Sequence, residues 1–202
     1  QGTVGLTGLQ WANLSSHIGT ASFFDLSTFS SRGNSGDVVR LDFNVSGFGV
    51  SLSTNSTGDH LSNGSQDSIA VSYNFGDWNV AAGYATNIKT TAVPAAELDM
   101  FSLSAAGNIG DFGVGIQYSD LENAGSKVVL NGSYDFGQTT VTAFVAHTDE
   151  DTAGSAGIGA TGDETEYGIG FTHSLGGATL AGGISRNYTE ETMADLGVRF
   201  NF

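Results

Sequence analysis

Apolar residues alternate with small or polar residues along most of the chain from residue 38 onward. In Ser68 to Phe75, for example, Ile69, Val71 and Tyr73 occupy every second position, with serine, alanine and asparagine between them. A repeat of two places successive side chains on opposite faces of an extended strand. The pattern therefore predicts β-strands that each carry one apolar face and one polar or small-residue face.

This alternation predicts an all-β, antiparallel protein. Eleven strands are expected, at Val38–Val45, Phe48–Ser53, Ser68–Phe75, Trp78–Ala85, Asp99–Ile109, Phe112–Ser119, Ser126–Phe136, Thr139–Thr148, Thr165–Leu175, Ala178–Arg186 and Thr192–Phe202.

The connections between these strands alternate between short and long. The short ones contain glycine, which accepts the backbone conformations of tight hairpins, and most are flanked by aromatic or large apolar residues. They contain Gly47, Gly76, Gly110, Gly137 and Gly176. The longer segments are polar and cover 55–66, 87–97, 120–125, 149–164 and 187–191. Tight turns at one end and long loops at the other are typical of outer-membrane barrels.

A soluble β-sandwich is the alternative, because its strands also alternate. The aromatic residues beside the turns favour a barrel with interfacial girdles. The non-apolar faces also favour it, since they are rich in glycine, serine and asparagine instead of lysine, glutamate and threonine. We therefore predict a transmembrane β-barrel of 11 to 12 readable strands. Bacterial barrels have an even strand number, so either Gly2 to Trp11 supplies a twelfth strand or the chain lacks its N-terminal part.

Composition narrows the function. The chain has six lysine and arginine residues against 21 aspartate and glutamate residues, a formal net charge of −15. This excludes a nucleic-acid partner, which requires clustered cations. No cysteine is present, which excludes disulfides and thiolate sites. No stretch approaches the roughly 20 apolar residues of a membrane helix, so strands must make any crossing.

The end of the sequence, from Gly176 to Ile184 and from Met193 to Phe202, resembles the closing hairpin of the general porins of purple-bacterial (alphaproteobacterial) type. The resemblance extends over Ser68 to Phe202. It implies a bacterial outer membrane location and a sixteen-stranded, homotrimeric pore with a loop folded inward to narrow the channel. The terminal strand, with Phe200 and Phe202, also resembles the signal that barrel-assembly machinery binds.

On this basis the chain divides into residues 1–37, a constriction-loop-like or N-terminal segment, and residues 38–202, an antiparallel meander of barrel strands. The first segment contains Asp25 and Arg32, which are candidate lumen charges. It departs from the family pattern, because inward-folded loops of this family are usually rich in aspartate and glutamate.

A pore needs charged side chains that face the lumen. Strand alternation places five of them opposite the apolar face: Arg40, Asp42, Lys127, Asp195 and Arg199. For Lys127 we favour a charge that pairs on a hydrated wall over a selective role. The negative net charge predicts a mouth that concentrates cations and hence mild cation selectivity.

One acidic loop offers a candidate divalent-cation site. Carboxylates surround a glycine-rich tip at Asp149, Glu150, Asp151, Asp163 and Glu164. Oxygen clusters of this kind bind calcium, but a solvated loop explains them as well, and we favour that interpretation because no EF-hand spacing is present. No other cofactor is expected.

The predicted function is an outer-membrane porin that passes small hydrophilic solutes and ions by passive diffusion, with membrane lipid around it. The alternative is a non-conducting structural or adhesive barrel that binds partners through its loops. An enzyme is not expected, because the four histidines form no zinc pair and no Gly-x-Ser-x-Gly turn occurs.

Overall fold

Backbone pairing joins the alternating segments into one sheet. The structure, a computed structural model, describes residues 37–56, 66–89, 97–123, 125–150, 164–186 and 190–200. The strands are β1 (Asp37–Val45), β2 (Phe48–Ser56), β3 (Gln66–Phe75), β4 (Trp78–Lys89), β5 (Glu97–Ile109), β6 (Phe112–Leu121), β7 (Gly125–Asp135), β8 (Thr139–Glu150), β9 (Glu164–Ser174), β10 (Ala178–Arg186) and β11 (Thr192–Phe200).

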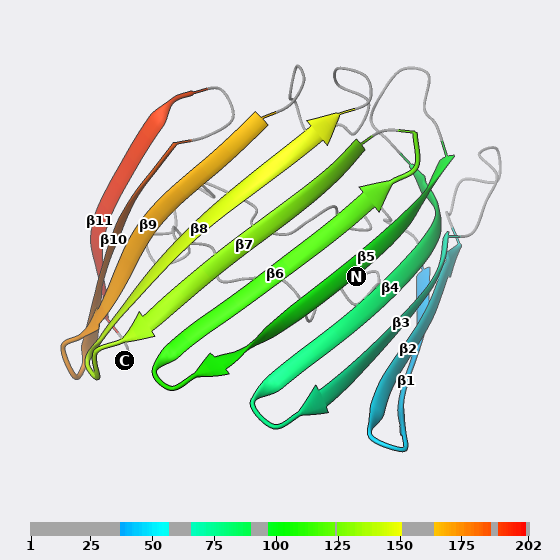
Figure 1. Cartoon of the computed structure of the whole chain (residues 1–202), viewed down its shortest axis with the longest axis horizontal. Helices are drawn as coiled ribbons and strands as arrows, with labels where there is room; N and C mark the ends of the chain where they lie inside the picture. The colour runs from blue at the N-terminus through cyan, green and yellow to red at the C-terminus, as the bar shows by residue number, and fades with distance from the viewer. Residues whose placement is uncertain are drawn as a thin grey trace.

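The eleven strands lie in sequence order, each antiparallel to the next. Figure 1 shows a curved sheet of tilted strands, with β1 and β11 at its two edges and the tight turns along one side. The predicted all-β class and the eleven strands are confirmed. In the ranges that the structure describes, no helix is long and apolar enough to cross a membrane.

The turn between β1 and β2 shows how local sequence sets the register. Ser46 and Gly47 both have positive φ, 51° and 86°, which is the conformation of a two-residue type I′ hairpin. The turn pairs Val45 with Phe48 and so aligns Arg40 with Ser53 along the hairpin. A two-residue turn therefore decides which side chains share a face.

One predicted loop is wrong. The segment 120–125 was expected to be a long polar connection, but Asp120 and Leu121 continue β6 and pair with Ser126 and Gly125. Only residues 122–124 connect the two strands, and the Glu122 amide donates a 2.9 Å hydrogen bond to the Asp99 carbonyl. Cross-strand backbone bonds form here because they do not depend on apolar side chains.

Several strands also extend beyond their predicted ends for the same reason, as β2 does to Ser56 and β4 to Lys89. At the other boundary, Asp37 is the first residue of β1 and not the last of the preceding segment. Asp25, Arg32 and the candidate strand Gly2 to Trp11 lie outside the described residues.

The exposure of apolar and polar side chains on the two faces of the sheet is the reverse of that in a soluble protein. On β5, Phe101 and Leu103 are 41% and 44% exposed, whereas Ser102 and Ser104 are 1% and 8% exposed. Large apolar side chains thus point out of the curved sheet and small polar ones point to its inner face, as predicted for a barrel. A soluble domain buries its apolar face instead.

Candidate functional site

The inner face of the sheet carries the candidate site. Five of the predicted lumen charges lie in the described part of the chain. The register places all five on this face, because each is paired with an inner-face residue of the neighbouring strand. Arg40 and Asp42 lie on β1, Lys127 on β7, and Asp195 and Arg199 on β11. The structure therefore puts them on one wall but at three separate places along it.

Arg40 and Asp42 form the only contact among these five charges that the described residues show in detail. Arg40 Nε donates to both carboxylate oxygens of Asp42 at 2.8 and 2.7 Å. Ser51, opposite Asp42 on β2, donates its hydroxyl proton to Asp42 Oδ1 at 2.5 Å. Arg40 Nη2 also lies 3.5 Å from Ser51 Oγ. Two opposite charges at neighbouring inner-face positions largely cancel at a distance.

Lys127 is 6% exposed and makes an interaction within the protein. Glu166, on β9 of the same face, is 7% exposed and likewise has a partner. Buried charges require such partners, since an isolated one is very costly. Glu166 was not among the predicted wall residues, although its alternation with Thr165 and Tyr167 could have indicated it.

Asp195 and Arg199 lie on β11 with Gly197 between them on the same face. Two strand steps of about 6.6 Å each separate their backbones by roughly 13 Å. Asp195 Oδ2 is buried and has no hydrogen-bond partner, whereas the Arg199 side chain is exposed. Within the described ranges the structure does not bring these two charges together.

Four uncharged polar side chains form a buried patch at the middle of β5 and β6. Ser102 lies opposite Ser119, and Ser104 lies opposite Gln117. Among the residues that the structure describes, their side-chain oxygen and nitrogen atoms have no hydrogen-bond partner. Buried polar groups are normally satisfied by protein or ordered water, so this patch of the wall is suited to hold water. Sequence alternation indicated the face but not the burial.

The inner face is not polar throughout. Val129, Phe144 and Ala146 form a buried apolar patch on β7 and β8, at 1%, 5% and 1% exposure, and Met100 is buried separately on β5, at 0%. The sequence analysis did not identify this apolar patch, because alternation within β7 and β8 is imperfect. It adjoins Lys127, whose neighbours on its own strand face include Val129.

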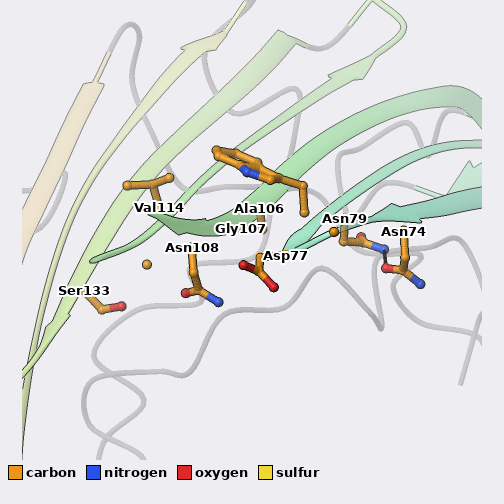
Figure 2. A pocket seen from close by; sticks show the side chains of 11 residues that line it. Asn74, Asp77, Asn79, Ala106, Gly107, Asn108, Val114 and Ser133 are labelled. Carbon is orange, nitrogen blue, oxygen red and sulfur yellow. Dashed lines mark hydrogen bonds between the residues drawn. The ribbon is translucent and has the colours of Figure 1, made fainter. Parts of the chain in front are cut away.

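Beside the tight turns, a cavity of about 480 Å³ is lined on the inner face by asparagine and serine side chains and on the outer face by Trp78 and Val114. We call it the amide notch and define it by Asn74, Asp77, Asn79, Asn108 and Ser133. Figure 2 shows these side chains on one side of the strands and Val114 on the other. Asn79 Nδ2 donates a 2.7 Å hydrogen bond to Asn74 Oδ1. Sequence reading missed the notch, because three separate hairpins build it.

The outer face carries aromatic side chains at two levels. Near the turns, the ring centroids of Phe48 and Tyr73 lie 4.7 Å apart, and those of Phe112 and Tyr134 lie 4.3 Å apart. Toward the other end of the strands the exposed aromatic residues are Tyr84, Phe101, Tyr118 and Tyr167. Aliphatic side chains fill the band between these levels. Two aromatic girdles around an apolar band are the signature of a membrane barrel.

The predicted calcium loop is only partly described. Asp149 and Glu150 are the last two residues of β8, and Glu164 is the first residue of β9. Asp151 and Asp163 lie outside the described residues. Among the residues that the structure describes, no group of three or more histidine, aspartate or glutamate side chains is arranged to hold a metal ion. The calcium site stays a prediction.

Of the two residues in the predicted assembly signal, Phe200 lies at the end of β11 and is 63% exposed on the outer face. Phe202 lies outside the described residues.

A family model described as Gram-negative porin matches residues 1–192 of the chain. A porin of Fuscovulum blasticum is 35% identical over 144 residues, which are 67% of this chain and 46% of that protein. A porin of Rhodobacter capsulatus is 28% identical over 192 residues, 82% of this chain and 61% of that protein. The chain thus spans about half of these relatives.

Solved structures agree with this likeness. A mutant of Rh. blastica porin shares the fold with a TM-score of 0.64 and 30% identity, covering 82% of this chain and 55% of that one. A porin structure refined at 1.8 Å gives a TM-score of 0.66 at 25% identity, covering 82% of this chain and 61% of that one.

Proposed function

The chain belongs to the family of Gram-negative porins, which places it in the bacterial outer membrane. On this premise we propose that its sheet forms part of the wall of a water-filled channel. The channel passes small hydrophilic solutes and ions by passive diffusion. The observation that supports this most directly is the inverted burial of the two faces, with apolar side chains outward and polar ones inward.

The outer face suits a lipid environment. Lipid chains can cover exposed leucine, isoleucine and phenylalanine side chains without a free-energy cost, whereas exposure of these side chains to water is unfavourable. Strands β2 to β10 each pair their backbone with a neighbour on both sides, as a bilayer requires of a spanning segment. Outer-membrane lipid is therefore the proposed partner of the band between the two girdles.

The inner face suits solute passage. The Asn74, Asn79 and Asn108 amides of this face are exposed or half-buried and offer hydrogen bonds to water. Because the charges of Arg40 and Asp42 cancel, the excess of acidic residues in the rest of the chain sets the ion selectivity. With a formal net charge of −15, the channel is proposed to be mildly cation-selective.

Two assemblies complete the proposal. The working channel is a homotrimer, as the family resemblance implies. Folding into the membrane proceeds through barrel-assembly machinery that binds the C-terminal strand, where Phe200 and Phe202 present apolar side chains.

Planar-bilayer recording of the full chain tests the function. Stepwise, ohmic openings with a reversal potential on the cation side support the proposal. A folded protein that inserts into the bilayer and conducts no ions would contradict it and would favour the adhesive barrel. Inorganic salt alone is sufficient as the permeating probe.

A further inference from the structure

We propose that the amide notch binds neutral polyhydroxylated solutes of monosaccharide to disaccharide size. The polar side chains of the notch lie on the inner side of the sheet beside the β3–β4 and β5–β6 turns. Its role in transport rests on the proposed function, because a solute reaches this face through a water-filled lumen.

The size of the notch fits such a ligand. Its volume of about 480 Å³ lies within the range of roughly 300 to 1,000 Å³ that small-molecule sites occupy. The wall of the notch is shared by β3, β4, β5, β6 and β7, so paired strands hold its side chains in place. Sites on rigid elements keep their geometry better than sites on loops.

The hydrogen-bonding groups of the notch match hydroxyl groups. A side-chain amide offers two N–H donors and an oxygen with two lone pairs. The bond between Asn79 and Asn74 uses one donor and one lone pair, which leaves most of that capacity for a ligand. Within the described part of the chain, the side chains of Asn108, Ser133 and Asp77 make no hydrogen bond. A sugar hydroxyl both donates and accepts, so it can bind to every one of these groups.

The glycines of the notch keep it open. A Cβ at Gly113 would lie 2.5 Å from Ser133 Oγ and 3.4 Å from Asn108 Oδ1. Any larger residue at 113 would therefore occupy the space between these two polar groups. The absence of a side chain there lets a solute approach both groups at once.

Charge excludes the other ligand classes. Among the described residues that line the notch there is no lysine, arginine or histidine, so an anion such as phosphate lacks a cationic partner among them. A divalent cation requires six or more oxygen ligands, and Asp77 is the only carboxylate that the described part of the chain contributes to the lining. Uncharged hydroxyl-bearing solutes are the class that fits what remains.

Binding should be weak and fast. The notch is wide, its asparagines are half-buried or exposed, and water competes for every hydrogen bond. These conditions predict dissociation constants in the millimolar range. Weak binding is what a conducting channel requires, because a solute must also leave.

The test is saturation-transfer NMR of sucrose with the full chain in detergent micelles, which needs no ion flow. We expect saturable transfer at millimolar sucrose. Asn79→Leu and, separately, Asn108→Leu should weaken binding by about threefold to tenfold, the effect of one hydrogen bond. Asn44→Leu is the matched control, because Asn44 is an exposed inner-face asparagine of β1 that does not line the notch.

Either of two results overturns the inference: no saturable transfer to sucrose, or equal weakening by Asn44→Leu and the two notch variants. Circular dichroism of each variant confirms that the sheet has formed. Salt conductance of the same samples keeps the two proposals apart. Conductance without sucrose binding would contradict only the proposal that the notch binds sugars. Sucrose binding without conductance would contradict only the proposal that the protein forms a channel.

Discussion

On the inner face of β1, Arg40 Nε donates hydrogen bonds to both carboxylate oxygens of Asp42, two residues further along the same strand. The Ser51 hydroxyl, on β2, donates to the same carboxylate. The charge of Arg40 is thus neutralised locally, although it is one of only six lysine and arginine residues in the chain.

The first prediction concerns this pair. A unit charge about 5 Å from a permeating ion in water changes its energy by roughly 0.8 kcal/mol before screening. Asp42→Asn leaves Arg40 uncompensated and should lower the ratio of cation to anion permeability several-fold, because roughly 0.8 kcal/mol is a factor of about four for each ion before screening. Arg40→Gln should raise the ratio by a similar factor. Reversal potentials in a salt gradient measure both.

The control for this pair is the double variant Arg40→Gln with Asp42→Asn, which should return close to the original ratio because both charges are gone. If the two single variants shift the reversal potential in the same direction, or neither shifts it, the assignment of Arg40 and Asp42 to the lumen is wrong.

The second prediction concerns Lys127, which is 6% exposed and partnered on the inner face. Lys127→Met should destabilise the protein by about 1 to 3 kcal/mol, because the substitution removes the interaction that this buried ammonium group makes within the protein. Urea unfolding from lipid vesicles measures the loss. Arg199→Met is the control, since Arg199 is exposed on the same face, and should change stability by less than about 0.5 kcal/mol. Equal effects of the two would contradict a buried role for Lys127.

The third prediction concerns Trp78 and Gly107, which are opposite each other on β4 and β5. The indole covers the glycine, and a Cβ at 107 would lie 2.7 Å from Trp78 Cε3. Gly107→Ala should therefore displace the ring and cost about 1 to 3 kcal/mol, as overpacking does. In a Trp11→Phe background, Trp78 is the only remaining tryptophan, and its emission should shift.

Gly132→Ala on β7 is the matched control, because the nearest atom to a Cβ there is the Gly113 carbonyl oxygen at 3.8 Å. It should leave both stability and emission nearly unchanged. A Gly107→Ala protein as stable as Gly132→Ala would show that the ring does not rest on the glycine.

The fourth prediction concerns the outer face. Leu130 lies in the middle of β7, is 52% exposed and pairs with Ile116 and Val145. Leu130→Arg should cost roughly 2 to 4 kcal/mol, because it puts a cation into the hydrocarbon layer. Asn44→Arg, on the hydrated inner face, should cost less than about 0.5 kcal/mol. Folding equilibria in lipid vesicles compare the two, and a reversed order would mean that the faces are assigned the wrong way round.

Much of this fold could be predicted from local pattern. The alternation of Ile69, Val71 and Tyr73 with small polar residues placed β3 and its two faces correctly. The same alternation placed Arg40 and Asp42 on the inner face. It failed at 120–125, where polar residues continue β6 into a tight hairpin, because backbone pairing does not depend on side-chain polarity.

The candidate site was less accessible to prediction. Alternation placed Lys127 on the correct face but could not show that it is buried, nor that Glu166 is buried on the same wall. The amide notch combines residues from three hairpins, up to 59 positions apart when Asn74 and Ser133 are compared. No short-range pattern carries that information.

Local pattern was enough to predict most of the strands, the face of most of their side chains and the glycine-containing turns, because a repeat of two and a glycine turn are properties of neighbouring residues. Which side chains meet depended on the complete fold. Register between strands brought Ser51 to Asp42 and Trp78 over Gly107, and the pairing of five strands built the notch from Asn74 to Ser133. Such contacts depend on hydrogen bonds between distant segments, whose alignment is set only when the whole sheet forms.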